Sequence, residues 1–223
     1  MRGADARGAS KMENSGDHRI ASHRITSIEQ LRALLGEPHP ATPRKLLTAL
    51  DETATGFIAR SPFLVLGTAD SAGNQDVSPK GGAPGFVAVE NPRTLVIPDG
   101  KGNKLLFGLQ NILETSRVGI IFMVPGTDET LRVNGTAELI VDPALLARLA
   151  ANGSAPQLAI RISVRECFFH CAKALIRSQL WKPESWSARI PFSWGKYLAR
   201  ASDGADAEAK IDRFVDLDYK NNL

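Results

Sequence analysis

The stretch VGIIFMVPGTDETLRVNGTAELIV (118–141) contains two runs of apolar and β-branched residues, 118–124 and 130–141, joined by a short polar segment. Runs of this kind are typical of β-strands, and the short connection predicts an antiparallel hairpin. Alternation along the second strand places its side chains on two opposite faces. One face carries Leu131, Val133, Ala137, Leu139 and Val141, and the other carries Thr130, Arg132, Asn134, Thr136 and Glu138.

Four further runs around this hairpin have the same character. They are FLVLGTA (63–69), GFVAVE (85–90), TLVIP (94–98) and RISVRECFFH (161–170). The connections ADSAGN (69–74) and ENPR (90–93) supply the glycine, asparagine and proline of tight turns. Five or six mostly antiparallel strands with few helices indicate a mainly β, α+β protein, with a barrel or a sandwich rather than a doubly wound sheet.

Helical patterns flank and separate these strands. The expected helices are one that begins after Ser27 and ends at Gly36, one over 43–53, one over 103–116, and one that starts at Asp142 and Pro143. We expect a disordered tail over 1–22, a helical segment over 23–60 and one principal domain over 61–200. Residues 201–223 are expected to form a C-terminal helix or tail that packs on this domain or on a partner subunit.

Composition and charge narrow the function classes. The 27 Lys and Arg residues nearly balance the 24 Asp and Glu residues, and no run of five basic residues occurs, which disfavours nucleic-acid binding. No apolar run approaches the length of a membrane helix. The first 24 residues contain no apolar leader core, and the chain has two cysteines, so we expect a protein of the reducing cytoplasm.

The standard catalytic motifs are absent from the chain. No GxGxxG follows a strand, and no P-loop, GxSxG or HExxH occurs. Cys167, His170 and Cys171 form C-x-x-H-C, but the second ligand pair of a zinc site is missing, so no metal site is predicted. On a strand, Cys167 and Cys171 share a face with Phe169, so at least one cysteine is expected to be a core thiol.

Two polar segments at strand edges are candidate anion sites. They are DVSPKGG (76–82) and PDGKGNK (98–104). In the second segment, Asn103 and Lys104 are expected to open a helix, whose N-terminal end favours an anion. Lys80 in the first segment could add a charge-assisted hydrogen bond. The alternative is that both segments are ordinary turns with solvated lysines.

Three other groups could take part in binding. Arg132 and Asn134 project from the same face of their strand, where an arginine could hold a phosphate or a carbonyl group. In AKALIRSQLW (172–181), a helical turn would align Lys173 with Arg177. The alternatives are a polar solvent-facing strand and a basic surface turn with Trp181 as a packing anchor.

The blocks SPFLVLGTADSAGNQDVSPKGG (61–82), TLVIPDGKGNK (94–104), ETLRVNGTAEL (129–139) and FFHCAKALIRSQLW (168–181) resemble, in this order, an FMN-dependent bacterial branch of the pyridoxamine 5'-phosphate oxidase-like superfamily. The resemblance extends from about Ile25 to Trp186. It implies a six-stranded antiparallel split β-barrel with flanking helices. It further implies a homodimer with two FMN molecules in clefts at the subunit interface.

The resemblance also implies roles for individual residues. Ser78, Lys80 and Gly81 would lie along the flavin and its ribityl chain, Asn103 and Lys104 at the phosphate, Ile97 and Asp99 beside the ring, and Arg132 on a strand that reaches it. Lys173, Arg177, Ser178 and Trp181 belong to a segment, 170–181, that would lie near the cofactor of the other subunit. The R-x-H-D-R ending of true pyridoxamine phosphate oxidases is absent, which argues against vitamin B6 synthesis.

The function expected from this resemblance is an FMN-dependent oxidoreductase. Electrons would pass between a small organic substrate and FMN, with dioxygen or a reduced nicotinamide as the other partner. His170 is the candidate for proton transfer because an ordinary histidine titrates near neutral pH. The alternatives are a binding module that holds flavin or haem without turnover, and a zinc protein built on the C-x-x-H-C group.

Overall fold

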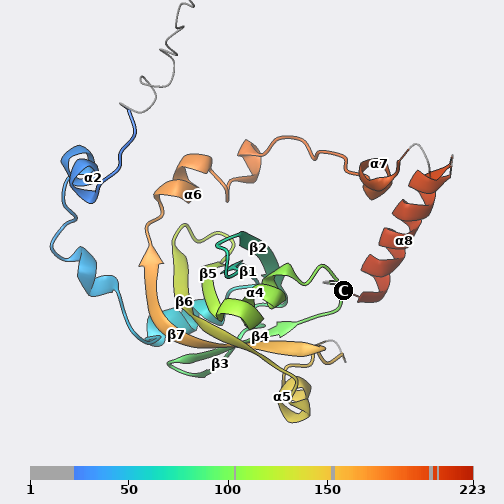
Figure 1. Ribbon diagram of the computed structural model, residues 1–223, viewed down its shortest axis with the longest axis horizontal. Helices are drawn as coiled ribbons and strands as arrows, with labels where there is room; N and C mark the ends of the chain where they lie inside the picture. Colours follow the sequence, from blue (N-terminus) through green and yellow to red (C-terminus); the bar gives the residue numbers. More distant parts are fainter. Residues whose placement is uncertain (1–22, 103, 152–153, 201–202, 205, 223) are drawn as a thin grey trace, which may run out of the picture. The chain divides into compact units, whose positions relative to one another are not determined.

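The computed structural model describes residues 23–102, 104–151, 154–200, 203–204, 206–222. The chain separates into two compact units, one that ends at Pro43 and one that runs from Arg44 to Leu223. Figure 1 shows the second unit built around a β-sheet. The tail expected over 1–22 lies outside the described residues, as does Asn103.

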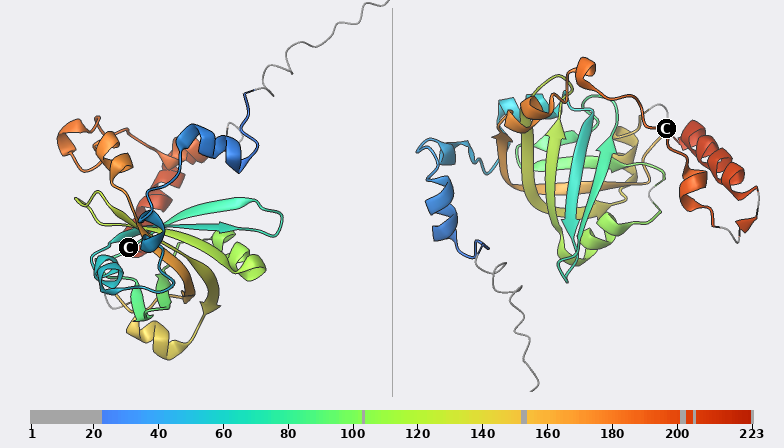
Figure 2. Two further views of the ribbon diagram at one scale, coloured as in Figure 1. Left: turned by 90° about the vertical axis from the view of Figure 1, so that its left-hand side faces the viewer. Right: turned by 90° about the horizontal axis from the view of Figure 1, so that it is seen from above.

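The sheet has seven strands in the order β2-β1-β5-β6-β7-β4-β3, and every neighbouring pair is antiparallel. The strands are β1 (Phe63–Ala69), β2 (Gln75–Gly81), β3 (Ala88–Asn91), β4 (Thr94–Asp99), β5 (Arg117–Met123), β6 (Thr130–Ile140) and β7 (Leu158–His170). The expected mainly β, α+β class is thus confirmed, and so is the hairpin over 118–141. The sheet is strongly curled but not closed, with β2 and β3 as its edges (Figure 2).

The structure has seven strands where six were expected, because β2 formed in a segment that was predicted only as an anion site at a strand edge or as a turn. Its sequence QDVSPKG contains a proline and no run of apolar residues. Proline is tolerated in an edge strand because one side of that strand forms no ladder hydrogen bonds. β2 is such a strand, since it pairs with β1 alone, from Gln75 opposite Ala69 to Gly81 opposite Phe63.

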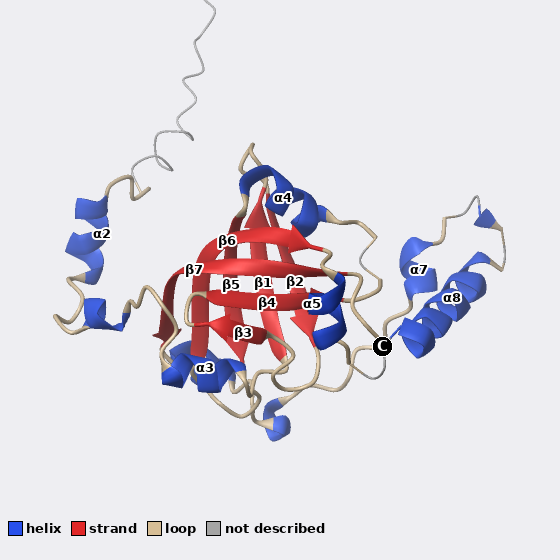
Figure 3. Ribbon diagram, turned by 90° about the horizontal axis from the view of Figure 1, so that it is seen from below, coloured by secondary structure: helices blue, strands red, loops and turns tan. Residues whose placement is uncertain are grey.

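Helices surround the sheet. Those of the second unit are α3 (Glu52–Ile58), α4 (Phe107–Thr115), α5 (Pro143–Arg148), α6 (Lys173–Ser178), α7 (Trp194–Leu198) and α8 (Ala207–Asn222), with 3-10 turns η1 (Thr42–Lys45), which begins before the boundary, and η2 (Pro183–Ser185). Figure 3 shows α3 and α4 at opposite ends of the sheet. Within the described residues, no helix is both long and apolar enough to cross a membrane.

Two capped helices formed where the sequence predicted them. In the first unit, α2 (Ile28–Leu35) starts at Ser27, whose hydroxyl accepts the Gln30 N–H, and it ends at Gly36 with φ 75°. α5 starts at Asp142, whose carboxylate accepts the Leu145 N–H. A side chain that satisfies a free N–H of the first turn is what makes these residues effective caps.

Of the two other helix predictions, the one over 43–53 was wrong and the one over 103–116 was right except for its start. The helix expected over 43–53 is replaced by η1 and by a bridge in which Leu47 pairs with Cys167 of β7. Leu47 and Leu50 pack in or against the core, whereas Leu46 is exposed, so the three leucines do not form one helix face. The helix expected over 103–116 begins only at Phe107. Leu106 before it has φ 60°, a left-handed conformation that interrupts helical backbone geometry.

The core lies inside the curl of the sheet. Alternation along each strand sends one set of side chains inward, and these are fully buried. They include Leu64, Leu66, Leu95, Ile97, Ile120, Phe122, Leu131, Ile160 and Ile162. The opposite face of β1, β5, β6 and β7 remains available for other contacts.

Candidate functional site

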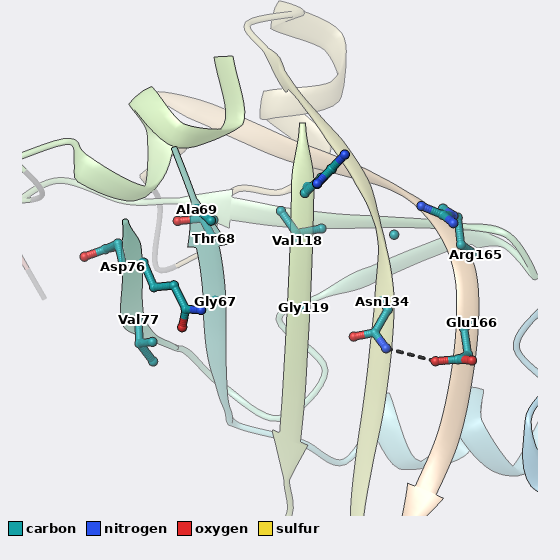
Figure 4. A pocket seen from close by; sticks show the side chains of 13 residues that line it. Gly67, Thr68, Ala69, Asp76, Val77, Val118, Gly119, Asn134, Arg165 and Glu166 are labelled. Carbon is teal, nitrogen blue, oxygen red and sulfur yellow. Dashed lines mark hydrogen bonds between the residues drawn. The ribbon is translucent and has the colours of Figure 1, made fainter. Parts of the chain in front are cut away.

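An open groove of about 620 Å³ crosses the outer face of the sheet (Figure 4). Five neighbouring strands, β2, β1, β5, β6 and β7, contribute to it. Its lining residues are Gly67, Thr68, Ala69, Gln75, Asp76, Val77, Arg117, Val118, Gly119, Asn134, Gly135, Arg165 and Glu166. A volume of this size lies within the roughly 300–1,000 Å³ of small-molecule sites.

The floor of the groove is bare backbone because two glycines face each other there. One row across the sheet runs from Val77 through Gly67, Gly119 and Asn134 to Glu166, each residue paired with the next. A Cβ added at Gly67 would lie 3.5 Å from the Gly119 carbonyl oxygen, and one added at Gly119 would lie 3.3 Å from Asn134 Oδ1. Larger residues at these two positions would fill the groove.

Polar and charged groups stand around this floor. Asn134 Nδ2 donates a 3.0 Å hydrogen bond to Glu166 Oε1, which orients both side chains (Figure 4). Arg165 lies at the register shift between β6 and β7: Glu166 pairs with Asn134 and Val164 pairs with Gly135, so no residue of β6 is directly opposite Arg165. Among the described residues, neither its guanidinium nor that of Arg117 forms an ion pair. The groove therefore carries two guanidinium groups, which can bind an anion, together with the two carboxylates of Asp76 and Glu166.

The inner face of β2 carries a separate polar row. Lys80 Nζ forms an ion pair with Asp99 Oδ1, and the two side chains are only 13% and 7% exposed. Ser78 lies on the same face, two residues before Lys80. A Cβ added at Gly108 would come within 3.8 Å of Ser78 Oγ, so α4 packs closely over this row. Lys80 and Asp99, each expected to contact a cofactor, thus contact each other.

The remaining predicted residues of this region differ in accessibility. Ile97 is fully buried in the core, so its side chain is not available to a ligand, whereas Gly81 at the end of β2 is exposed. Lys104 is exposed. Because α4 begins at Phe107, Lys104 does not open a helix, so that part of the prediction was wrong.

Arg132 lies on the outer face of β6, partly buried, with its guanidinium 5.2 Å from the ring centre of Phe168. Phe168 is directly opposite Arg132 on β7. This cation–π contact holds Arg132 against the sheet. Arg132 and Asn134 project together, as the alternation predicted, although only Asn134 lines the groove.

The C-terminal candidates are grouped at the end of β7. Lys173, Arg177 and Ser178 belong to α6 and are exposed, and the Ser178 hydroxyl donates to the Leu175 carbonyl. Trp181 Nε1 donates a 2.8 Å hydrogen bond to the Thr127 carbonyl oxygen, which joins this segment to the turn between β5 and β6. His170, the last residue of β7, is exposed and lies opposite Thr130.

The two cysteines have different environments. Cys167 is fully buried, and its Sγ donates to the Ala49 carbonyl at 3.1 Å. Burial raises the pKa of its thiol, and the negative charges of Asp51 and Glu166 raise it further. Cys171 is exposed. The prediction of a core thiol is therefore confirmed for Cys167. The described residues contain no cluster of His, Cys, Asp and Glu suited to a metal ion.

The groove itself was missed in the sequence. Of its lining residues, only Asp76 and Val77, in the candidate anion segment 76–82, and Asn134, paired with Arg132 as a polar face, belonged to regions proposed for binding. The sequence does not show that Gly67 and Gly119 face each other, because about fifty residues separate them in the chain. The one available signal was a glycine within each of two apolar strands, which often marks close approach of another group.

Arg117, Arg165 and Lys104 are the groups that would hold a flavin phosphate, and Asp76 and Glu166 add two carboxylates to the groove. Arg117 and Arg165 lie in the groove, and Lys104 is exposed in the segment between β4 and α4. None of these three cations forms an ion pair with a described residue. Guanidinium and ammonium groups that are not already neutralised are the protein groups that bind phosphate. Lys80 does not have this freedom, because Asp99 neutralises it.

The second unit is thus a mainly β fold in which a curled antiparallel sheet carries an open groove on its outer face. The family model described as pyridoxamine 5'-phosphate oxidase matches residues 50–171, more than half of the chain, which therefore belongs to this family. The matched region begins just before α3 and ends just after β7.

Solved structures are also similar to this chain. HupZ of Group A Streptococcus has 17% identity, with 54% of this chain and 93% of that chain covered and a TM-score of 0.44. A Lactobacillus delbrueckii protein described as a pyridoxamine 5'-phosphate oxidase has 25% identity, with 55% and 95% covered and a TM-score of 0.43. General Stress Protein 26 of Bacillus anthracis has 15% identity, with 52% and 88% covered and a TM-score of 0.40. No curated protein matches.

Proposed function

We propose that this protein is a homodimeric, FMN-dependent oxidoreductase of the cytoplasm with the split-barrel architecture of its family. Membership of the pyridoxamine 5'-phosphate oxidase family over residues 50–171 is the observation that carries this proposal. FMN would supply the redox chemistry when bound, and the electrons would pass to or from a small organic substrate or a reduced nicotinamide. The chain would supply binding, orientation and exclusion of water.

The outer face of the sheet supports the homodimer. Phe63, Val77 and Ile121 lie on this face with 37%, 65% and 38% of their surface exposed, although apolar residues of this size are usually buried. A second copy placed over this face would cover them. It would also close the open groove, which lies among the same strands. A cofactor held there would lie between two subunits.

Charge supports the placement of the phosphate. Lys104, Arg117 and Arg165 form no ion pair with described residues, so a dianionic phosphate would not have to displace an existing partner. Lys80 and Asp99 would instead meet an uncharged part of the ligand, because together they carry no net charge. His170 is exposed and is the group on the chain that we propose for proton transfer.

A flavin titration tests cofactor binding. We expect the purified protein to bind FMN with an absorption band near ~450 nm, and to bind riboflavin, which lacks the phosphate, more weakly. Lys104→Ala should weaken FMN by about tenfold and leave riboflavin unchanged, since a charge-assisted contact contributes about 1.5–3 kcal/mol. Lys210→Ala on α8 is the matched control. A protein that refuses FMN, or that shows a haem Soret band instead, would contradict the proposal.

Two further measurements test the dimer and the activity. Size-exclusion chromatography with light scattering should give a molar mass of two 24.0 kDa chains. Ile121→Asp should yield a monomer that has lost FMN. The FMN-loaded dimer should be reduced by a nicotinamide or by a small organic donor without oxygen, and reoxidised in air. If the protein binds FMN but no common donor reduces the flavin, the protein is a flavin-binding module and the proposed enzyme activity is wrong.

A further inference from the structure

A second cavity, of about 460 Å³, lies apart from the groove on the outer sheet face. It is formed by α3, the turn between β5 and β6, and the end of β7. Its lining residues are Thr53, Phe57, Arg60, Val124, Thr127, Glu129 and Phe169. None of these residues lines the groove or belongs to the proposed flavin site.

The floor of this cavity is aromatic. Thr53, Phe57 and Arg60 recur at positions i, i+4 and i+7, so they project from one side of α3 and the turn that follows it. The Phe57 and Phe169 rings meet edge to face, with centres 5.4 Å apart and planes at 82°. Both rings are only partly buried, although they pack against the core. An apolar or aromatic body placed over them would complete their burial.

The rim carries two opposite charges that do not neutralise each other. Arg60 donates one guanidinium hydrogen bond to the Gly56 carbonyl at 2.9 Å, which orients the side chain and leaves other N–H groups available. Within the described part of the chain, Arg60 and Glu129 form no ion pair, either together or with another residue. A guanidinium and a carboxylate therefore face one cavity, each without a counter-charge.

The turn between β5 and β6, which carries Glu129, is held by a residue that does not line the cavity, Trp181. Trp181 donates its indole N–H to the Thr127 carbonyl, so the segment after α6 is attached to the turn between β5 and β6. That turn supplies Val124, Thr127 and Glu129. Its position depends on the tertiary contact with Trp181, and not only on the short connection between two strands.

We propose that this cavity binds a small amphoteric molecule with an aromatic or apolar body. Its anionic group would contact Arg60, its cationic group would contact Glu129, and its body would cover Phe57 and Phe169. The cavity volume lies within the range of small-molecule sites. Arg60 and Glu129 are both exposed at the rim, and a ligand with a single charge would pair with only one of them, so both charges contribute to recognition. The site does not depend on flavin binding.

An NMR titration of the full-length protein tests this proposal. The amphoteric probes are L-phenylalanine, whose charges are adjacent, and 4-(aminomethyl)benzoate, whose charges lie at opposite ends of a ring. We expect at least one probe to shift the backbone amide signals of Phe57, Thr127 and Glu129, with a Kd at or below roughly 1 mM. Benzoate and benzylamine, which carry one charge each, should bind at least about tenfold more weakly.

Matched variants identify the site. Arg60→Gln and Glu129→Gln should each weaken the amphoteric probe about ten- to hundredfold. Arg93→Gln and Asp128→Asn, which change exposed or partly exposed charges outside the cavity, should leave it unchanged. Thr53→Trp fills the cavity from the exposed side of α3 and should abolish binding of the probe. The NMR spectrum of this variant should remain that of a folded protein. No shift with either probe, or shifts that survive the Arg60 and Glu129 changes, would overturn the proposal.

Discussion

Lys80 and Asp99 form an ion pair between β2 and β4, two strands that four other strands separate in the order of the sheet. Among the described strands, no ladder joins β2 to β3 or β4 across the open side of the sheet. This side-chain contact therefore links two distant parts of the curled sheet. Its partners are 13% and 7% exposed, so the pair is mostly removed from water.

Asp99→Asn should destabilise the protein strongly. The change leaves the Lys80 ammonium mostly buried without a counter-charge, which costs about 3–5 kcal/mol in comparable buried pairs. Urea unfolding followed by circular dichroism measures the loss. The double variant Lys80→Met/Asp99→Leu should recover most of it, because no charge then remains buried. A loss below about 1 kcal/mol for Asp99→Asn would show that the pair is solvated in solution.

Gly135→Ala should be far more damaging than Gly67→Ala. A Cβ at Gly135 would lie 2.1 Å from the Ser163 carbonyl oxygen, so the backbones of β6 and β7 would have to separate. A Cβ at Gly67 would lie 3.5 Å from its nearest neighbour, an ordinary contact. We expect a loss of at least about 2 kcal/mol for Gly135→Ala and under about 1 kcal/mol for Gly67→Ala. Equal unfolding midpoints for the two variants would contradict this difference.

The two thiols should react at very different rates. The folded protein should show one thiol reactive with a maleimide at pH 8, Cys171, and the unfolded protein should show two. Cys171→Ser should remove the fast reaction, and Cys167→Ser should leave it intact. Mass spectrometry of the labelled peptides assigns each site. Fast labelling of Cys167 in the folded protein would mean that it is not buried.

Because Cys167 is buried, we also expect the free energy of unfolding to fall at alkaline pH. The pKa of its thiol is raised above the ordinary 9.0, chiefly by burial. The folded state therefore favours the protonated thiol. Its contribution to stability is fully present below pH 9.0 and is lost as the pH rises through the raised pKa. Urea unfolding at successive pH values should show a smaller alkaline decline for Cys167→Ala than for the unchanged protein.

Asp212 of α8 should hold α7 in place at neutral pH. Its carboxylate accepts the Gly195 N–H at 2.7 Å and the Ser193 hydroxyl at 2.8 Å. The Gly195 hydrogen bond, followed by that of Ser193, lowers the pKa of Asp212 below its ordinary 3.8. This contribution is present above pH 3.8 and is lost as the pH falls through the lowered pKa.

Asp212→Asn should accordingly loosen α7 from α8. Faster hydrogen exchange of the Gly195 amide and a changed Trp194 fluorescence would report the loss, because Trp194 Nε1 donates to the Tyr219 hydroxyl across the same two helices. Asp216→Asn, a neighbouring exposed change on α8, is the control and should have no effect. Unchanged exchange in Asp212→Asn would show that other contacts hold α7.

Local features of the sequence determined much of the fold. Short runs of apolar and β-branched residues were enough to predict β1, β4, β5, β6 and β7, because such residues favour extended backbone. Ser27 and Asp142 predicted the starts of α2 and α5, because a cap acts within three residues of itself. The family resemblance, carried by blocks from 61 to 181, agrees with the match over 50–171.

Only the tertiary structure decided the candidate sites. Lys80 looked like a free cation in the sequence, and it is paired because the curl of the sheet brings Asp99 to it. The groove exists because strand register places Gly67 opposite Gly119, and the second cavity exists because α3 packs Phe57 against Phe169. Strand and helix patterns act over a few residues, whereas these contacts depend on register and curvature that arise from all strands together.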